Sequence, residues 1–328
     1  DGSFDEVRIS KTARSLEWIE AEYRNQDDPA GSLTGRTDQV YVSGTVFADR
    51  GLTPVGSGVP VALSIEGGVS AGTDLFTTTT GDDGSYAFAL TPAAMSAGKR
   101  LLLFRDDDVA GTDDAAAMTV SDGGNLFDLD LYGDSVIVRD EEAGIPTVND
   151  LSNATNGDVD IPYTVPAGLS VDSGTDLYVP AGISFEPGNA VAVGSAGDGT
   201  SDLVVEGDMT LGGSTSAGGT VAGKGSVSVG DFGLEADAGV EVNTLSMTAS
   251  GTTTVTGSWS VSSFTPGGGR VIFDGSGEVP AETFSELELT AGTLIATGAL
   301  TVSGALVLTG GTFAPGPYTH SVAGSWND

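Results

Sequence analysis

The sequence contains no cysteine and a single histidine, His320. Disulfide bonds and thiolate metal sites are therefore excluded, and with them the small disulfide-stapled scaffolds of many secreted domains. No run of about 18 apolar residues occurs, so we expect no membrane-spanning helix. His320 lies in an alternating stretch, Pro317 to Val322, that is typical of a structural position. Because nucleophilic catalysis needs a base, the sequence does not indicate an enzyme.

Basic residues are scarce, with 12 Lys and Arg against 46 Asp and Glu and a net charge of −34. Such a chain repels the phosphates of nucleic acids and of anionic membranes, so neither is an expected partner. Two explanations of the acidity stay open. The carboxylates can form a solvated surface, as in adaptation to salt, or they can hold calcium.

Glycine is abundant, at 50 of 328 residues, and short Val, Leu, Ser and Thr runs separate the glycines. This composition favours short strands joined by tight turns. Five basic residues lie in 1–36, five in 37–140, and Lys224 and Arg270 alone serve the last 188. We therefore predict an all-β fold: an immunoglobulin-like β-sandwich over 37–135 and a right-handed β-solenoid over 136–328, with one short helix near the N-terminus in region 1–36.

Region 1–36 alternates from Phe4 to Ser10, which predicts a strand. Ser15 is a candidate N-cap for a helix with Leu16, Ile19 and Tyr23 on one face, ended by Asp28-Pro29. The string DGSFDEVRISKTARSLEWIEAEYRNQ resembles the closing strand and helix of laminin-G-like, concanavalin-type jelly rolls in bacterial and archaeal surface proteins. The resemblance implies a remnant of such a domain, without the loops that carry its glycan or calcium sites.

Region 37–135 contains alternating runs such as 40–47, 59–65, 85–90 and 100–104, separated by turns. This spacing is typical of a β-sandwich. The phrases VSGTVFAD, GVPVALSIEGG and TTTTGDDGSYAFAL are similar to the B-type repeats of Gram-positive adhesins and to carboxypeptidase-regulatory-like domains. The resemblance implies an immunoglobulin-like stalk spacer. Because the first strand has no lysine at the expected place, we expect no internal isopeptide bond.

Region 136–328 changes to very short Val, Leu and Thr strands with glycine turns, the texture of a β-solenoid. The string around Trp259 returns around Trp326, 67 residues later, which predicts a 67-residue internal repeat. The strings RVIFDGSGEVPAETFSELEL and LTVSGALVLTGGTFAPGPYTHSVAGSWND resemble repeats of filamentous-haemagglutinin-like surface proteins. The N-terminal end falls inside the jelly-roll remnant and the C-terminal end inside one of these repeats, so we expect a segment of a longer polypeptide.

Calcium is the cofactor that the sequence leaves open, since hard cations bind several oxygen ligands from flexible loops. The densest acidic cluster is the candidate metal site: Asp106, Asp107, Asp108, Asp113 and Asp114. For this cluster, calcium binding and simple turn building stay equally open. For Asp82-Asp83 and for the loop Asp198 to Asp202, turn building is favoured, because Asp and Gly form turns without a ligand.

Together these features predict a non-enzymatic structural subunit of an extracellular fibre, sheath or stalk at the cell surface. We expect its partners to be copies of itself, joined through β-strand or end-to-end contacts. The alternative is a surface adhesin that binds glycans or other cell-surface ligands, with Trp259 and Trp326 as candidate sugar-stacking residues. The favoured role for these tryptophans is in repeated core or turn positions.

Overall fold

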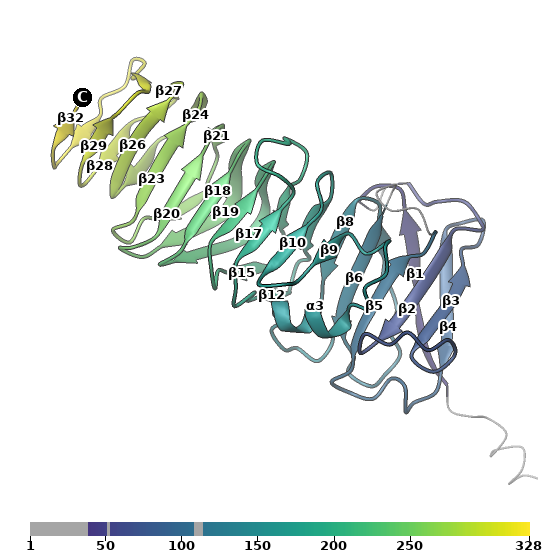
Figure 1. Ribbon diagram of the computed structural model, residues 1–328. Helices are drawn as coiled ribbons and strands as arrows, with labels where there is room; N and C mark the ends of the chain where they lie inside the picture. Colours follow the sequence, from purple (N-terminus) through teal and green to yellow (C-terminus); the bar gives the residue numbers. More distant parts are fainter. Residues whose placement is uncertain (1–38, 51–52, 108–113) are drawn as a thin grey trace, which may run out of the picture.

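The computed structural model describes residues 39–50, 53–107 and 114–328. These residues form an elongated molecule, with a unit of mainly antiparallel strands at one end and a β-solenoid along the rest (Figure 1). Strands make up 48% of the structure, so the predicted all-β fold with a solenoid is confirmed. The strand predicted for 4–10 and the helix predicted from Ser15 lie outside the described residues.

The antiparallel unit has two sheets that enclose a hydrophobic core. One sheet has the order β4-β1-β7, and the other has the order β8-β6-β5-β2-β3. The strand bounds are β1 (Val40–Phe47), β2 (Pro60–Ile65), β3 (Leu75–Thr79), β4 (Ser85–Leu90), β5 (Arg100–Arg105), β6 (Ala115–Val120), β7 (Leu131–Tyr132) and β8 (Ser135–Val138).

The second of these sheets is buried on both faces. Alternate side chains of a strand point to opposite faces, and in β5 Leu101 and Leu103 join the core between the two sheets. Leu102 and Phe104 point the other way and join a second core, which continues along the solenoid. This arrangement explains why β5 is an unbroken apolar run rather than an alternating one.

Strand β8 joins the antiparallel unit to the solenoid. It pairs in parallel with β6, Ala115 to Met118 opposite Ser135 to Val138, and in parallel with the first long solenoid strand, β11 (Asp176–Val179). The antiparallel sheet and part of the solenoid therefore belong to a single 13-stranded sheet. One hydrophobic cluster also runs from Ala62 in β2 to Leu306 in the solenoid.

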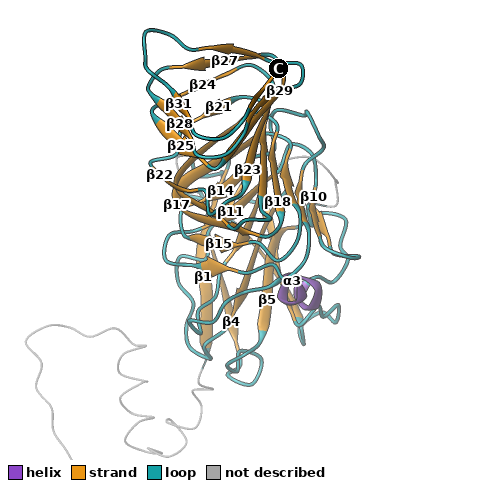
Figure 2. Cartoon of the chain, turned by 90° about the vertical axis from the view of Figure 1, so that its left-hand side faces the viewer, coloured by secondary structure: helices purple, strands orange, loops and turns teal. Residues whose placement is uncertain are grey.

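A short helix, α3 (Val148–Ala154), covers the outer face of this sheet beside β5 (Figure 2). Val148, Leu151 and Ala154 are buried against the shared core. At its N-terminus, Asp150 accepts hydrogen bonds from the Thr147 amide (2.9 Å) and hydroxyl (2.8 Å), as in a capping box. The sequence did not lead us to predict this helix.

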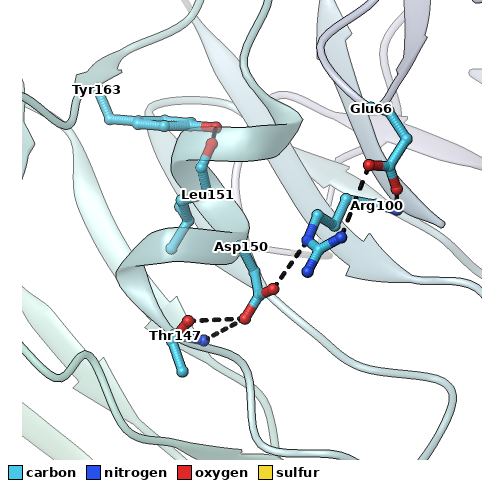
Figure 3. Close-up of polar contacts among 6 residues, drawn as sticks. All are labelled: Glu66, Arg100, Thr147, Asp150, Leu151 and Tyr163. Carbon is cyan, nitrogen blue, oxygen red and sulfur yellow. Dashed lines mark hydrogen bonds and ion pairs between the residues drawn. The ribbon is translucent and has the colours of Figure 1, made fainter. Parts of the chain in front are cut away.

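Polar contacts fasten α3 to the sheet (Figure 3). Arg100 Nε donates a 2.9 Å hydrogen bond to Asp150 Oδ1, and Arg100 Nη1 lies 3.6 Å from Glu66 Oε2. On the other side, the Tyr163 hydroxyl donates to the Leu151 carbonyl oxygen at 3.2 Å. The helix is thus held by both apolar and charged contacts at the point where the two parts of the molecule meet.

The solenoid has about 11 turns, built from short parallel strands. One stack runs β9-β10-β13-β16-β18-β20-β23-β26-β29-β32, and the other strands form the remaining walls. The bounds are β9 (Tyr163–Thr164), β10 (Leu169–Val171), β12 (Ser184–Phe185), β13 (Val191–Val193), β14 (Leu203–Val205), β15 (Asp208–Thr210), β16 (Thr215–Ala217), β17 (Thr220–Gly230), β18 (Gly233–Ala236), β19 (Gly239–Met247), β20 (Thr252–Val255), β21 (Ser258–Trp259), β22 (Ser263–Thr265), β23 (Arg270–Asp274), β24 (Gly277–Val279), β25 (Glu282–Phe284), β26 (Glu286–Ala291), β27 (Thr293–Ala296), β28 (Leu300–Val302), β29 (Leu306–Leu308), β30 (Thr312–Ala314), β31 (Ser321–Val322) and β32 (Trp326–Asn327).

The register of these strands stacks apolar side chains in columns inside the coil. One column consists of paired residues from successive turns: Val171, Val193, Ala217, Ala236, Val255, Phe273, Leu289 and Leu308. Glycine lets the turns approach each other closely. A Cβ added at Gly257 would overlap the carbonyl oxygen of Ala238 in the preceding turn.

The two tryptophans of the 67-residue repeat occupy different places in the coil. Trp259 lies in β21, which pairs with β19, and is 1% exposed. Trp326 lies in β32, which pairs with β29 on another wall, and is 55% exposed. The residues that stack on each other are one turn apart in the sequence, for example Leu287 and its register partner Leu306.

Candidate metal centre

Five carboxylates converge beside the junction of the two parts of the molecule. Asp106 and Asp107 directly follow β5, and Asp114 directly precedes β6. Asp158 and Asp160 come from the loop after α3, in which Asp158 Oδ1 accepts the Asp160 amide hydrogen at 3.1 Å. The ends of two neighbouring strands and one loop therefore bring together acidic residues that are about 50 positions apart in the sequence.

The carboxylates form two groups that share Asp160. One oxygen each of Asp106, Asp158 and Asp160 lie within 4.8 Å of one another, and the same holds for Asp107, Asp114 and Asp160. Asp160 is fully buried and Asp114 is 6% exposed. Arg105 contributes positive charge at the edge of the cluster, with Nη2 3.2 Å from Asp107 Oδ2.

This set of donors fits a hard divalent cation. Calcium takes roughly six to eight oxygen ligands, with carboxylates binding through one or both oxygens. The five residues offer oxygen donors only, without the nitrogen or sulfur ligands that zinc sites usually contain. Burying carboxylates is costly unless a positive charge compensates, which a bound cation would supply in addition to Arg105.

The structure places part of the site predicted from sequence. Asp106, Asp107 and Asp114 lie together, whereas Asp108 and Asp113 are outside the described residues. Sequence reasoning missed Asp160, which belongs to both groups, and Asp158, which belongs to the first. The available signal was the spacing Asn156-Gly157-Asp158-Val159-Asp160, an oxygen-rich run with carboxylates at alternate positions.

The two other acidic runs build turns, as their sequences favoured. Asp198 accepts hydrogen bonds from the amides of Ser195, Thr200 and Ser201 and from the Ser201 hydroxyl. Partial burial works against ionisation of Asp198, but these hydrogen bonds outweigh it and hold the pKa of its carboxyl below the ordinary value. Asp83 accepts from the Ser85 amide and hydroxyl in the same way.

Two features that resemble catalytic elements have structural roles. The Nδ1 atom of His320 accepts the Leu300 amide hydrogen at 3.1 Å, and its Nε2 lies 2.8 Å from the Pro315 carbonyl oxygen. Residues 68–72 have the spacing Gly-x-Ser-x-Gly, but they form the turn between β2 and β3, not a turn from a strand into a helix. The Ser70 carbonyl oxygen accepts the Thr73 amide hydrogen within that turn.

Trp259, one of the two candidate sugar-stacking residues, is a core residue. Its indole packs edge-on against Phe264 and Phe284, with ring centroids 4.9 Å and 5.7 Å away. Its Nε1 lies 3.3 Å from Glu282 Oε2, so the polar atom is also engaged. A buried ring presents no face to a glycan, which removes this residue from the adhesin hypothesis.

The chain matches no family model, no curated protein and no solved structure in the comparisons with known proteins. The resemblances noted in the sequence therefore stay predictions. Within the part of the chain that the structure describes, no helix combines the length and apolar character needed to cross a membrane.

Proposed function

We propose that this chain is a rigid, non-enzymatic spacer in an extracellular fibre, sheath or stalk. The observation that carries the proposal is the continuity of the 13-stranded sheet through β6, β8 and β11. A hinge between domains usually lies in an exposed linker that few contacts cross. Here backbone pairing and a shared hydrophobic cluster cross the junction instead.

The elongated shape supports the same role (Figure 1). In a solenoid, each turn contacts mainly its neighbours, so length grows by a constant step per turn. Parallel strands lie about 4.8 Å apart, which sets that step. A protein of this kind fixes the distance between the elements at its two ends. In the proposal, region 37–135 forms an immunoglobulin-like spacer and the coil over 136–328 is right-handed.

A calcium ion at the carboxylate cluster is the second part of the proposal. Asp106, Asp107 and Asp114 belong to the antiparallel unit, while Asp158 and Asp160 belong to the segment that leads into the solenoid. A cation bound by both sets would cross-link the two parts beside α3. It would also offset the repulsion among carboxylates that a chain of net charge −34 concentrates there.

Shortening the solenoid in the native assembly tests the spacer function. Because β18 and β20 pair in register, deletion of residues 234–252 removes one turn and brings Gly233 before Thr253, whose register partner is Leu234. We expect fibres that assemble normally but whose repeat is shorter by about 4.8 Å for each removed turn. An unchanged repeat, or loss of a ligand-binding activity with the repeat intact, would contradict the spacer function.

A further inference from the structure

The antiparallel unit has an open side between two edge strands. Strand β4 is the last strand of its sheet, and β3 is the last strand of the 13-stranded sheet. A groove of about 390 Å³ lies between them, and its apolar lining residues are Ala71, Leu75, Phe76, Ala87, Phe88, Ala89 and Leu90. The opposite edges of β4 and β3 pair with β1 and β2, whereas on this side no strand of the described residues pairs with either of them.

The pairing of β1 shows which backbone groups of β4 point outward. The backbone groups of Tyr41 and Ser43 bond to the β7 side, through Leu126 and Leu129. The intervening residues of β1 therefore face β4 and bond to Tyr86, Phe88 and Leu90. It follows that the amide and carbonyl groups of Ala87 and Ala89 point away from β1, into the open side.

The outward backbone groups of Ser85 already have hydrogen-bond partners at this edge. Its carbonyl oxygen accepts the Gly81 amide hydrogen at 2.8 Å, and its amide donates to Asp83 Oδ1 at 3.1 Å. Ala87 and Ala89 are left as two adjacent outward residues with four strong backbone groups. Exposed edges of this kind are templates for another strand, and proteins usually block them with charge, proline or a bulge.

Strands β3 and β4 themselves contain no charged residue and no proline; the nearest are Asp74, the Asp82-Asp83 turn and Pro92, all outside the two strands. No charged residue occurs from position 75 to 81 or from 84 to 98, although the chain has 58 charged side chains. The β1–β4 register also continues without a bulge from Val40–Leu90 to Thr45–Ser85. Two copies that each carry a net charge of −34 repel each other over most of their surfaces. The uncharged β4 edge is where one copy can approach another with the least repulsion.

We infer that the β4 edge pairs with the β4 edge of a second copy around a twofold axis. The inference rests on the proposed function in a fibre, sheath or stalk, and it names a contact through which copies of the chain would associate. Antiparallel pairing of Ala87 with Ala89 of the other copy, and of Ala89 with Ala87, would satisfy the four outward backbone groups of each copy in four hydrogen bonds. Phe88 then lies opposite Phe88 of the second copy, over the two apolar grooves.

Engineered cysteines test both the contact and its register, because the chain has no cysteine of its own. Hydrogen-bonded antiparallel partners have Cα atoms about 5.5 Å apart, within the disulfide range, whereas diagonal neighbours are about 7–8 Å apart. A mixture of Ala87→Cys and Ala89→Cys chains should therefore cross-link several-fold faster than either variant alone. Ala281→Cys, on an exposed turn of the solenoid, is the control.

A mixture that cross-links no faster than Ala281→Cys would overturn the inference, and fastest cross-linking of Ala87→Cys with itself would overturn the register. In sedimentation velocity, Ala87→Lys should dissociate the wild-type dimer, whereas Ala281→Lys should leave it unchanged. A monomeric wild-type chain that binds a synthetic Phe4–Ser10 peptide in the groove would show that a segment of this chain is the occupant. A monomer that is still a rigid rod would contradict this inference but not the spacer function.

Discussion

Arg100, at the start of β5, donates a 2.9 Å hydrogen bond to Asp150 in the first turn of α3. Arg100 is one of the links between the antiparallel unit and the segment that enters the solenoid, and its backbone amide also donates to Glu66 Oε1 at 2.6 Å within the antiparallel unit. Asp150 is at the same time the residue that caps α3, through Thr147. One carboxylate thus starts the helix and fastens it to the sheet.

Arg100→Ala should lower the free energy of unfolding by about 1–2 kcal/mol, because it leaves a half-buried carboxylate without its charged donor. Chemical denaturation monitored by circular dichroism measures the change. Arg270→Ala is the matched control, since Arg270 also contacts two carboxylates, Glu286 and Glu288, but is 50% exposed. Equal losses for the two variants would show that Arg100 has no special role at the junction.

Trp259→Ala should destabilise the solenoid by about 3–5 kcal/mol, as expected for removing a large buried ring. The ring fills the coil between Phe264, Phe273 and Phe284. Trp326→Ala removes the same side chain from an exposed position and should change stability by about 0.5 kcal/mol or less. A small effect at Trp259 would mean that the aromatic cluster does not hold the coil together.

Most of the solenoid could be predicted from the sequence, because the residue pattern that forms each turn lies within a short stretch of chain. Each turn repeats a few Val, Leu or Phe residues and a glycine, and the registered column from Val171 to Leu308 follows that rule. The sequence contains an indication of the start of helix α3, the Thr147-x-x-Asp150 capping box, although we did not predict the helix. The exchange of pairing partners at β8 has no such signal, because Ser135 to Val138 is an ordinary apolar run.

Only some residues of the candidate metal centre could be predicted from the sequence. The run from Asp106 to Asp114 is conspicuous in sequence, and three of its residues lie in the cluster. Asp160 has only one near acidic neighbour along the chain, Asp158, and it joins the cluster because the loop after α3 returns to the ends of β5 and β6. Asp160 approaches the other carboxylates only in the folded chain, so neither composition nor residue spacing indicates this contact.

The pKa of Asp198 predicts a pH dependence of stability. Because its folded-state pKa is held below the ordinary value, the ionised carboxylate stabilises the folded chain above the unfolded-state pKa of about 4. That contribution is lost as the pH falls through the folded-state pKa. Asp198→Asn should therefore be less stable than wild type at pH 7, and the difference should shrink on acidification.

Thermal unfolding of both chains at pH 7 and at about pH 3 measures this difference. Asp208→Asn, at an exposed position of β15, is the control and should track wild type at both values. A difference between wild type and Asp198→Asn that grows as the pH falls would contradict the assigned role of the carboxylate.

Calcium should raise the midpoint of thermal unfolding, and removal of calcium by a chelator should reverse the increase, since a ligand that binds only the folded state stabilises it. Asp160→Asn should abolish the calcium response, because Asp160 belongs to both carboxylate groups. Asp208→Asn is the control: it also removes one negative charge but lies outside the cluster, so its unfolding midpoint should respond to calcium like that of wild type. Titration calorimetry without a binding signal in the wild-type chain would rule out the site.

The central claim, rigidity across the junction, is tested most directly by distance measurements between paired spin labels in otherwise cysteine-free chains. The first pair, Tyr41→Cys with Glu241→Cys, spans the junction, and the second, Glu241→Cys with Thr301→Cys, lies within the solenoid. All three positions are exposed, and dilution with unlabelled chain removes contributions between molecules. The continuous sheet predicts distance distributions of equal width for the two pairs. A distribution across the junction several-fold broader than the one within the solenoid would contradict the account.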